Sequence, residues 1–240
     1  MAEFRIDQIC KSYLTEKRRL HVLNGVSIAG DTDEITVILG KSGCGKTTLL
    51  RILCGLEEAD SGTFSFPSGT VPGMVFQEPR LMPWLSVREN VEFGVPKELR
   101  SAQETQAIID VVGLTGFENA KPATLSGGMQ HRAALARTLA CKNPMVLMDE
   151  PFASLDYFTR ATMQRELIRI HQDTHMGAIF VTHNIEEAIL LGDRICILSE
   201  GVISAEFRQE PSGNGRDVMT QESIALKKRI LAELNAERRE

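Results

Sequence analysis

The chain has 240 residues, of which 42% are hydrophobic and 25% are charged, and its formal net charge is −5. This composition excludes a fibrous or disordered chain and fits a globular protein with one sizeable core. The acidic balance, with a pI near 5.7, argues against a protein that binds nucleic acid through a basic face. Five cysteines without a C-x-x-C pair favour reduced thiols over a zinc site.

The chain shows no sign of a membrane span or a targeting segment. No apolar run reaches the roughly 18 residues that cross a bilayer, and the N-terminal M-A-E-F-R resembles neither a signal peptide nor a transit peptide. We therefore expect the protein in the cytosol.

The N-terminal part predicts antiparallel strands that lead into a turn. Short β-branched stretches run from Phe4 to Ile28 and are broken at Asn24-Gly25. A strand is predicted at residues 35–39, followed by G-K-S-G-C-G-K-T at residues 40–47 and a helix over residues 46–53 that ends near Gly55.

Residues 40–47 have the spacing of a P-loop, two glycines followed by a lysine and a hydroxyl, in the strand–turn–helix context that such a loop requires. Glycines let successive backbone N–H groups point at a phosphate near the positive end of the helix. Lys46 supplies a positive charge, and Thr47 offers a hydroxyl to Mg²⁺. Cys44 is interpreted as a small tolerated side chain, because phosphoryl transfer needs no protein nucleophile.

The middle of the chain changes from β to helical character. Residues 61–69 read as a hairpin region, and Met74-Val75-Phe76 as a buried strand that ends at Gln77. A helical insertion is predicted between residues 96 and 125 and stopped by Gly113. Its apolar residues at roughly helical spacing are Leu99, Ala102, Ile109 and Val112.

The second half alternates helices and strands. We predict a helix at residues 129–140, a strand at 145–148, a helix at about 157–171 and a strand at 178–182 that ends at His183. This order implies a parallel sheet whose carboxyl ends collect the functional loops. A charge-dense terminal helix at about 224–234, within a tail at 211–240, is interpreted as solvated and partly packed.

The predicted fold is therefore α/β: a P-loop NTPase core with a parallel sheet, an N-terminal antiparallel β subdomain and an inserted helical subdomain at about residues 80–140. All 240 residues are expected to form one such domain.

Two adjacent acids follow the strand at residues 145–148. Asp149 at the strand tip suits Mg²⁺, and Glu150 suits a water aligned on a γ-phosphate. An apolar strand that ends in Asp-Glu is weak on its own, because a surface turn explains it equally well. Together with the P-loop upstream it indicates a nucleoside triphosphate site.

The segment L-S-G-G-M-Q at residues 125–130, together with the P-loop and the acidic pair, resembles the signature of the ATP-binding subunits of ABC transporters. The resemblance continues through Gln77, A-S-L-D at residues 153–156 and V-T-H at residues 181–183, and it spans roughly residues 4–207. Ser-Gly-Gly by itself would be read as a helix N-cap and turn.

The resemblance implies a Mg²⁺-dependent ATPase and a role for each matching residue. Tyr13 would stack on adenine, with strand packing as its alternative role. Glu150 would be the general base or orient the water, and His183 would contact the γ-phosphate. Thr47, Gln77 and Asp149 would surround Mg²⁺. The residues that would wrap the phosphates are Gly40, Lys41, Ser42, Gly43, Cys44, Gly45, Lys46, Thr47 and Thr48.

Ser126, Gly127, Gly128 and Met129 would act on a second subunit, completing its site across a head-to-tail homodimer. We expect Ser126, Gly127 and Gly128 to precede a helix that begins near Met129, so that its N–H groups face a γ-phosphate. ATP binding would then favour closure of the dimer, and hydrolysis would release it.

Two positions depart from the common family pattern: Met129 stands where glutamine is most frequent, and Asn184 where aspartate is usual. Neither change removes a phosphate-contacting group, although Asn184 lacks the charge of aspartate. We expect these two departures to affect only the rate of ATP hydrolysis.

The segment at residues 77–91 resembles the ATPases of importers for nitrate, sulfonates, taurine and related small solutes, chiefly through Pro83-Trp84. A rigid tryptophan beside two prolines suits docking of a membrane subunit, and packing on the helical subdomain is the alternative. The expected partners are a second ATPase subunit, transmembrane permease subunits and, indirectly, an extracytoplasmic solute-binding protein. The protein would lie peripherally on the inner face of the cell membrane.

Three other functions stay open. An ATPase of an exporter or a lipid-extraction system shares every nucleotide motif and would differ mainly around residues 78–95. A non-transport ABC ATPase would act on DNA or ribosomes, usually with paired modules, coiled coils or basic surfaces, none of which this sequence shows. A P-loop kinase would not need Ser126-Gly127-Gly128 or His183.

Overall fold

The structure is a computed structural model that describes residues 3–15, 18–67, 70–210 and 216–236. The strands are β1 (Glu3–Leu14), β2 (Arg19–Asp31), β3 (Ile35–Leu39), β4 (Ser61–Ser65), β5 (Gly73–Val75), β6 (Met145–Asp149), β7 (Gly177–Thr182), β8 (Arg194–Ser199) and β9 (Val202–Arg208). The helices are α1 (Lys46–Leu53), α2 (Val87–Val91), α3 (Ala102–Val111), α4 (Gly127–Ala140), α5 (Tyr157–Thr174), α6 (Ile185–Leu191) and α7 (Gln221–Ala236), with 3₁₀ turns η1 (Lys97–Leu99) and η2 (Pro122–Thr124).

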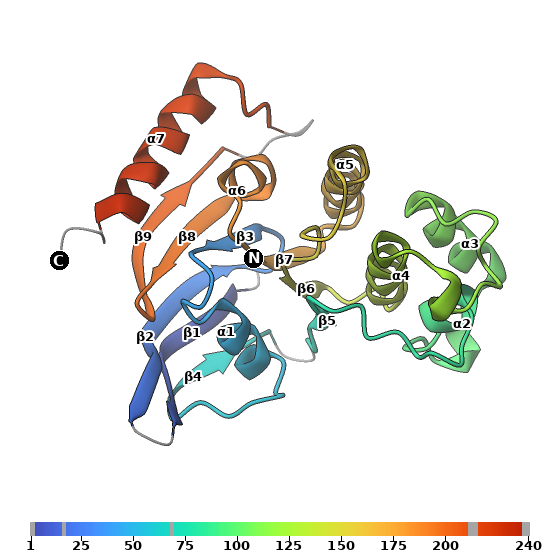
Figure 1. Ribbon diagram of the computed structural model, residues 1–240, viewed down its shortest axis with the longest axis horizontal. Helices are drawn as coiled ribbons and strands as arrows, with labels where there is room; N and C mark the ends of the chain where they lie inside the picture. Colours follow the sequence, from blue (N-terminus) through green and yellow to red (C-terminus); the bar gives the residue numbers. More distant parts are fainter. Residues whose placement is uncertain (1–2, 16–17, 68–69, 211–215, 237–240) are drawn as a thin grey trace.

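A six-stranded sheet in the order β5-β6-β7-β3-β8-β9 forms the centre of the molecule (Figure 1). Its strands are parallel except for the edge strand β9, which runs antiparallel to β8. Every position of β3, β6, β7 and β8 is buried, as expected for parallel strands that are covered on both faces. The predicted α/β class with a parallel sheet is confirmed.

Alternating residues of the central strands feed two separate cores. Val37 and Leu39 belong to a core formed with helices α2 to α7, whereas Ile38 belongs to a second core that contains α1 and the N-terminal strands. This is the two-residue period of a β-strand. Helix α7 closes the first core by burying Ile230, so the predicted terminal helix is packed on one side.

The N-terminal sheet has the order β2-β1-β4 and is antiparallel, as predicted. The predicted break at Asn24-Gly25 is wrong, because β2 continues through it. Gly25 has φ 93°, and the β1–β2 pairing shifts register beside it, which makes this a bulge and not a strand end. The predicted hairpin at residues 61–69 is also wrong: β4 pairs with β1, and residues 68 and 69 lie outside the described part.

The helical region differs in detail from the prediction. Helix α2 was not predicted, because it is only five residues long and shows no helical period. It begins with a capping box at Ser86 and Glu89. Leu99 lies in η1 and is 70% exposed, so it is not part of the helix that buries Ile109. Helix α3 does end before Gly113, which has φ 65°. The limits of a helical subdomain at residues 80–140 stay a prediction.

Other helix and strand boundaries differ from the predicted ones by a few residues. β5 ends at Val75, so Phe76 lies beyond it, and α5 and α7 are longer than predicted. Helix α4 begins at Gly127, two residues before the predicted start.

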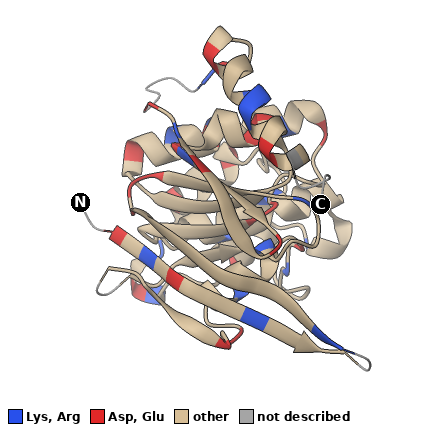
Figure 2. Ribbon diagram, turned by 90° about the vertical axis from the view of Figure 1, so that its left-hand side faces the viewer, with Lys and Arg blue, Asp and Glu red and all other residues tan. Residues whose placement is uncertain are grey.

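In the view of Figure 2, acidic and basic residues are both scattered over the ribbon. Among the described residues, no helix is both long enough and apolar enough to cross a membrane.

Candidate functional site

Residues 40–47 form the turn between β3 and α1. Gly45 precedes the first residue of α1 with φ 106°, a left-handed conformation that glycine adopts easily. A Cβ on Gly45 would come within 2.7 Å of a Leu23 methyl carbon and 2.9 Å of the Val22 carbonyl oxygen. The left-handed backbone and the lack of space for a Cβ therefore both require glycine at position 45. The turn places the N-terminus of α1 at a strand tip, where unpaired N–H groups attract anions.

Lys46 is 5% exposed and is held inside this turn. Its Nζ donates to the carbonyl oxygens of Gly40 and Lys41, each at 2.9 Å, and lies 3.8 Å from Glu150 Oε1. The two hydrogen bonds use two of the three donors of the ammonium group. The third donor is suited to a phosphate oxygen. Lys41, Ser42 and Gly43 are exposed at the outer side of the turn.

Thr47, Gln77 and Asp149, the three residues predicted to surround Mg²⁺, line one hollow of about 120 Å³. Thr47 Oγ1 donates to Asp149 Oδ1 at 3.2 Å. Asp149 is 2% exposed, and its burial raises the pKa of the carboxyl group, opposed by the Thr47 hydrogen bond. A hydroxyl, an amide oxygen and a carboxylate are the oxygen donors that Mg²⁺ prefers, so these residues fit the ion.

Glu150 lies between a lysine and a histidine. Its Oε2 is 2.8 Å from His183 Nδ1, and its Oε1 is the atom that faces Lys46. The two residues meet because β6 and β7 are neighbouring parallel strands and Asp149 pairs with Val181. The Glu150 side chain is 15% exposed and that of His183 is 56% exposed. A carboxylate in this position can orient water or accept its proton.

Glu150 also has φ 46°, which is uncommon for a residue with a side chain. Its N–H donates to the Val181 carbonyl oxygen at 3.0 Å, and this bond holds the turn directly after β6. A positive φ at a non-glycine residue often marks a functional site. Nothing in the sequence signals this conformation.

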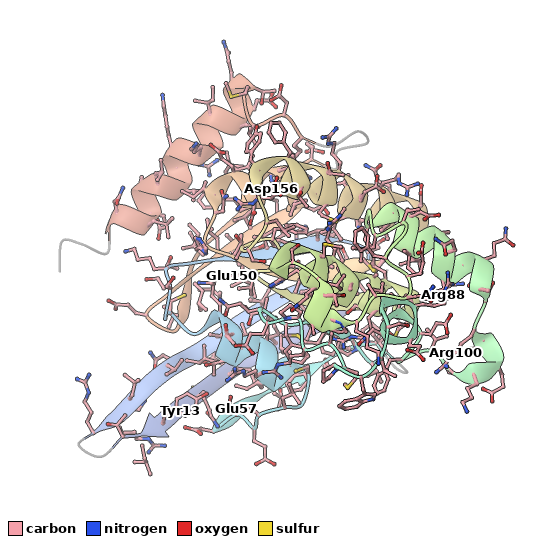
Figure 3. The ribbon with its side chains drawn as sticks, turned by 45° about the vertical axis from the view of Figure 1, so that its right-hand side comes forward. Tyr13, Glu57, Arg88, Arg100, Glu150 and Asp156 are labelled. Carbon is pink, nitrogen blue, oxygen red and sulfur yellow. The ribbon has the colours of Figure 1, made fainter. Side chains whose placement is uncertain are left out.

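Tyr13 lies on β1 beside the start of α1. Its hydroxyl donates to Glu57, and the two residues are labelled side by side in Figure 3. Lys11 Nζ lies 5.5 Å from the ring centre. Burial raises the pKa of Tyr13, and the hydrogen bond to Glu57 adds to this effect, whereas one to Thr48 lowers it. Tyr13 is thus next to a predicted phosphate-binding residue. Its stacking on adenine stays a prediction. The contact of Tyr13 with Glu57 was not predicted from the sequence.

Residues 126–129 belong to a different part of the molecule. Ser126 Oγ accepts from the Met129 N–H at 3.3 Å, which makes Ser126 the N-cap of α4. Gly127 and Gly128 therefore belong to the first turn of the helix and do not precede it, which corrects the prediction, whereas Ser126 does precede it. Figure 1 shows α4 grouped with α2 and α3, apart from α1. The N-cap is present, and an action on a second subunit stays a prediction.

A strand–turn–helix P-loop at the carboxyl end of an interior strand of a parallel sheet defines a nucleotide-binding α/β protein of the P-loop class. Residues 23–153 match the ABC transporter family, and the chain belongs to that family. This match includes the P-loop, Gln77, the segment at residues 125–130 and the acidic pair, and it ends before His183.

Relatives and solved structures agree with this assignment. The chain is 41% identical over 189 residues to the aliphatic sulfonates import ATP-binding protein of Paracoccus denitrificans, covering 78% of this chain and 77% of that protein. It is 38% identical over 214 residues to the nitrate import ATP-binding protein of a Synechocystis strain, covering 84% and 80%. A dimeric ATP-binding cassette bound to ADP and Pi has a TM-score of 0.79 at 28% identity, covering 87% of this chain and 100% of that one. The predicted family and its importer branch are confirmed.

Proposed function

We propose that the chain binds ATP with Mg²⁺ and hydrolyses it, and that it energises an importer for a small solute of the nitrate, sulfonate or taurine type. The observation that carries the proposal is the contact of Glu150 with both Lys46 and His183 at one end of the sheet. This arrangement places a carboxylate between a phosphate-binding cation and an imidazole. The sulfonate and nitrate import proteins among the relatives support the transport role.

Different residues bind the phosphates, the Mg²⁺ ion and the adenine ring of the nucleotide. Backbone N–H groups at the start of α1 and the ammonium of Lys46 bind the phosphates. Thr47, Gln77 and Asp149 would hold Mg²⁺ directly or through water, and a bound ion would supply positive charge that neutralises the transferring phosphate. Tyr13 stacks on the adenine ring.

Glu150 and His183 prepare the water. The Glu150 carboxylate accepts a hydrogen bond from the attacking water and orients it, or removes its proton. His183 holds Glu150 through Nδ1 and contacts the γ-phosphate. The positive φ of Glu150 fixes the direction in which this side chain leaves the strand.

A second copy of the chain completes the site. Ser126 and Gly127 are exposed at the start of the 14-residue helix α4, and nothing lies within 4 Å of where a Cβ of Gly127 would be. An open helix N-terminus can receive the γ-phosphate of a partner. The dimeric state of the similar cassette structure supports a head-to-tail homodimer.

A membrane subunit is the second partner that we propose. An apolar hollow of about 370 Å³ beside the candidate site is lined by Met74, Phe76, Met82 and Phe93, with Arg80 and Arg137. Trp84 is 66% exposed, so it is not packed away on the neighbouring helices. An apolar hollow and an exposed, rigid aromatic side chain each fit an apolar segment of a permease. The chain would then lie on the inner face of the membrane.

Uptake measured in a strain that lacks the subunit tests the proposal. We expect this chain to restore uptake of one solute from a panel of nitrate, taurine and aliphatic sulfonates, and purified protein to hydrolyse ATP only with Mg²⁺. Restored export, or hydrolysis with no uptake of any panel solute, would favour an exporter ATPase or a non-transport role.

Replacing Trp84 by alanine tests the membrane contact. We expect Trp84→Ala to retain the ATPase rate of the isolated subunit, because Trp84 is not among the residues that line the hollow of Thr47, Gln77 and Asp149. We expect it to lower uptake about tenfold or more, as for an interface hot spot of ~2 kcal/mol. Phe117→Ala is the matched control, since Phe117 is also an exposed aromatic residue, at 44%, but lies outside the segment at residues 77–91. Full uptake with Trp84→Ala rejects this contact.

A further inference from the structure

Glu187 on α6 is a buried carboxylate to which the proposed reaction assigns no role. It is 6% exposed. Its Oε2 accepts a hydrogen bond from Thr182 Oγ1 at 2.6 Å, and its Oε1 accepts one from Gln164 Nε2 at 3.3 Å. Arg160 Nε lies 3.9 Å from the same Oε1. One carboxylate therefore joins the end of β7 to two positions on α5.

The β7 side of this network leads directly to the histidine of the site. Thr182 is the residue before His183, and its Oγ1 also accepts from the Asn184 N–H at 3.0 Å. Its carbonyl oxygen accepts from the Gly40 N–H of the P-loop at 3.4 Å. Glu187, through the Thr182 hydroxyl, thus fixes the backbone on both sides of His183.

The α5 side of the network leads to residues 153–156. Arg160 Nη2 donates to the Leu155 carbonyl oxygen at 2.9 Å. The next residue, Asp156, caps α5 by accepting from the N–H groups of Phe158 and Thr159, and Figure 3 shows it at one end of α5.

Leu155 also lies close to the segment predicted to act on a second subunit. A Leu155 methyl carbon lies 3.4 Å from where a Cβ of Gly128 would be. Residues 126–128, residues 153–156 and His183 are therefore connected through Leu155, Arg160 and Glu187.

The chemistry of this network favours a fixed geometry. A buried carboxylate is costly unless it is paired and hydrogen-bonded, and bonds to an ionised acceptor are stronger than neutral ones. Glu187 therefore holds Thr182 and Arg160 in a defined relative position. A displacement of residues 153–156 would reach Thr182 through the same side chain.

We propose that Glu187 is a positioning residue for His183, coupling residues 153–156, and with them the Ser126-Gly127-Gly128 segment, to the His183–Glu150 pair. The inference rests on the proposed function and adds how contact with a second subunit reaches the hydrolytic groups. Glu187 itself touches neither Glu150 nor the P-loop in this network.

The test compares Glu187→Gln with Glu186→Gln in the full-length chain. Glu186 is the matched control, because it lies on the same helix but its side chain is 59% exposed and pairs with Lys227. Imidazole NMR of protein labelled at histidine, without nucleotide, reports on His183, whose signals are assigned with His183→Gln. We expect Glu187→Gln to shift the His183 signals and leave those of the exposed His21, and Glu186→Gln to leave both in place.

Two further measurements separate positioning from a general loss of structure. We expect Glu187→Gln to keep the Kd for ATP and to lower kcat about 10- to 100-fold, the range for a misplaced catalytic group. Thr182→Ser keeps the hydroxyl and is expected to keep the wild-type His183 spectrum, whereas Thr182→Val is expected to shift it. In a double-mutant cycle, the effects of Arg160→Met and Glu187→Gln on kcat are expected to be non-additive.

The spectrum decides the inference independently of the ATPase activity. A His183 spectrum in Glu187→Gln that matches the wild type overturns it, as does an equal shift in Glu186→Gln. Wild-type protein that hydrolyses no ATP would overturn the proposed function, and the nucleotide-free spectra would still support or reject the link from Glu187 to His183.

Discussion

Replacing Glu150 by glutamine is expected to lower kcat for ATP hydrolysis at least ~100-fold, the range for loss of a general base, while ATP still binds. Glutamine keeps the length and nearly the shape of the side chain but loses the charge that faces water. The contacts of Lys46 with the Gly40 and Lys41 carbonyl oxygens do not involve Glu150, so the phosphate site survives. Steady-state phosphate release and ATP titration measure the two effects.

Glu200→Gln is the matched control for this substitution. Glu200 is exposed and has φ 46°, the same value as Glu150, so both substitutions place glutamine at a residue with positive φ. We expect Glu200→Gln to hydrolyse ATP at the wild-type rate. Wild-type turnover in Glu150→Gln would remove the role given to Glu150.

Replacing Lys46 by alanine is expected to weaken ATP binding itself. A hydrogen bond to a charged group contributes about 1.5–3 kcal/mol, which corresponds to roughly a 10- to 100-fold higher Kd. The change also removes the two bonds by which Nζ ties the turn to Gly40 and Lys41, so the loop loses part of its shape. Isothermal titration with ATP and Mg²⁺ measures the Kd.

Lys142→Ala serves as the control for Lys46→Ala. Lys142 is 67% exposed and pairs with Glu104 on the surface, and its removal is expected to leave the Kd for ATP unchanged. Equal ATP affinity in Lys46→Ala and the wild type would contradict the assignment of residues 40–47 as the phosphate-binding loop.

The parallel core could be predicted because its signals are local. The strand at residues 35–39 and the helix at 46–53 match β3 and α1 at both ends, since a continuous apolar run and a P-loop mark their limits. The motif order also identified the family, because five short segments with separate physical roles occur together. Spacing along the chain was sufficient for these predictions.

Features set by tertiary contacts could not be predicted. The bulge at Gly25 follows from the pairing of β2 with β1. β4 pairs with β1 across 51 residues of chain at Cys10–Ser61 and 60 at Arg5–Ser65, a long-range pairing, so local turn signals suggested a hairpin instead. Helix α2 is too short to show a period. Its capping box, S-V-R-E at residues 86–89, was a signal that could have found it.

The candidate site was predicted in its residue types but not in its connections. Glu150 and His183 were assigned separate tasks, and their 2.8 Å contact follows only from the pairing of β6 with β7. Glu187 carries no motif of its own. Its position between Thr182 and Arg160 depends on the packing of α6 against α5 and β7, which one sequence does not show.

The central claim is that two copies of the chain share the γ-phosphate of ATP. Sedimentation equilibrium of Glu150→Gln with Mg²⁺ tests it most directly, because slow turnover keeps ATP bound during the run. We predict a mass about twice that of the 26.6 kDa chain with ATP and a lower average mass with ADP. The mass of a single chain at saturating ATP, or the same mass with both nucleotides, would contradict the claim.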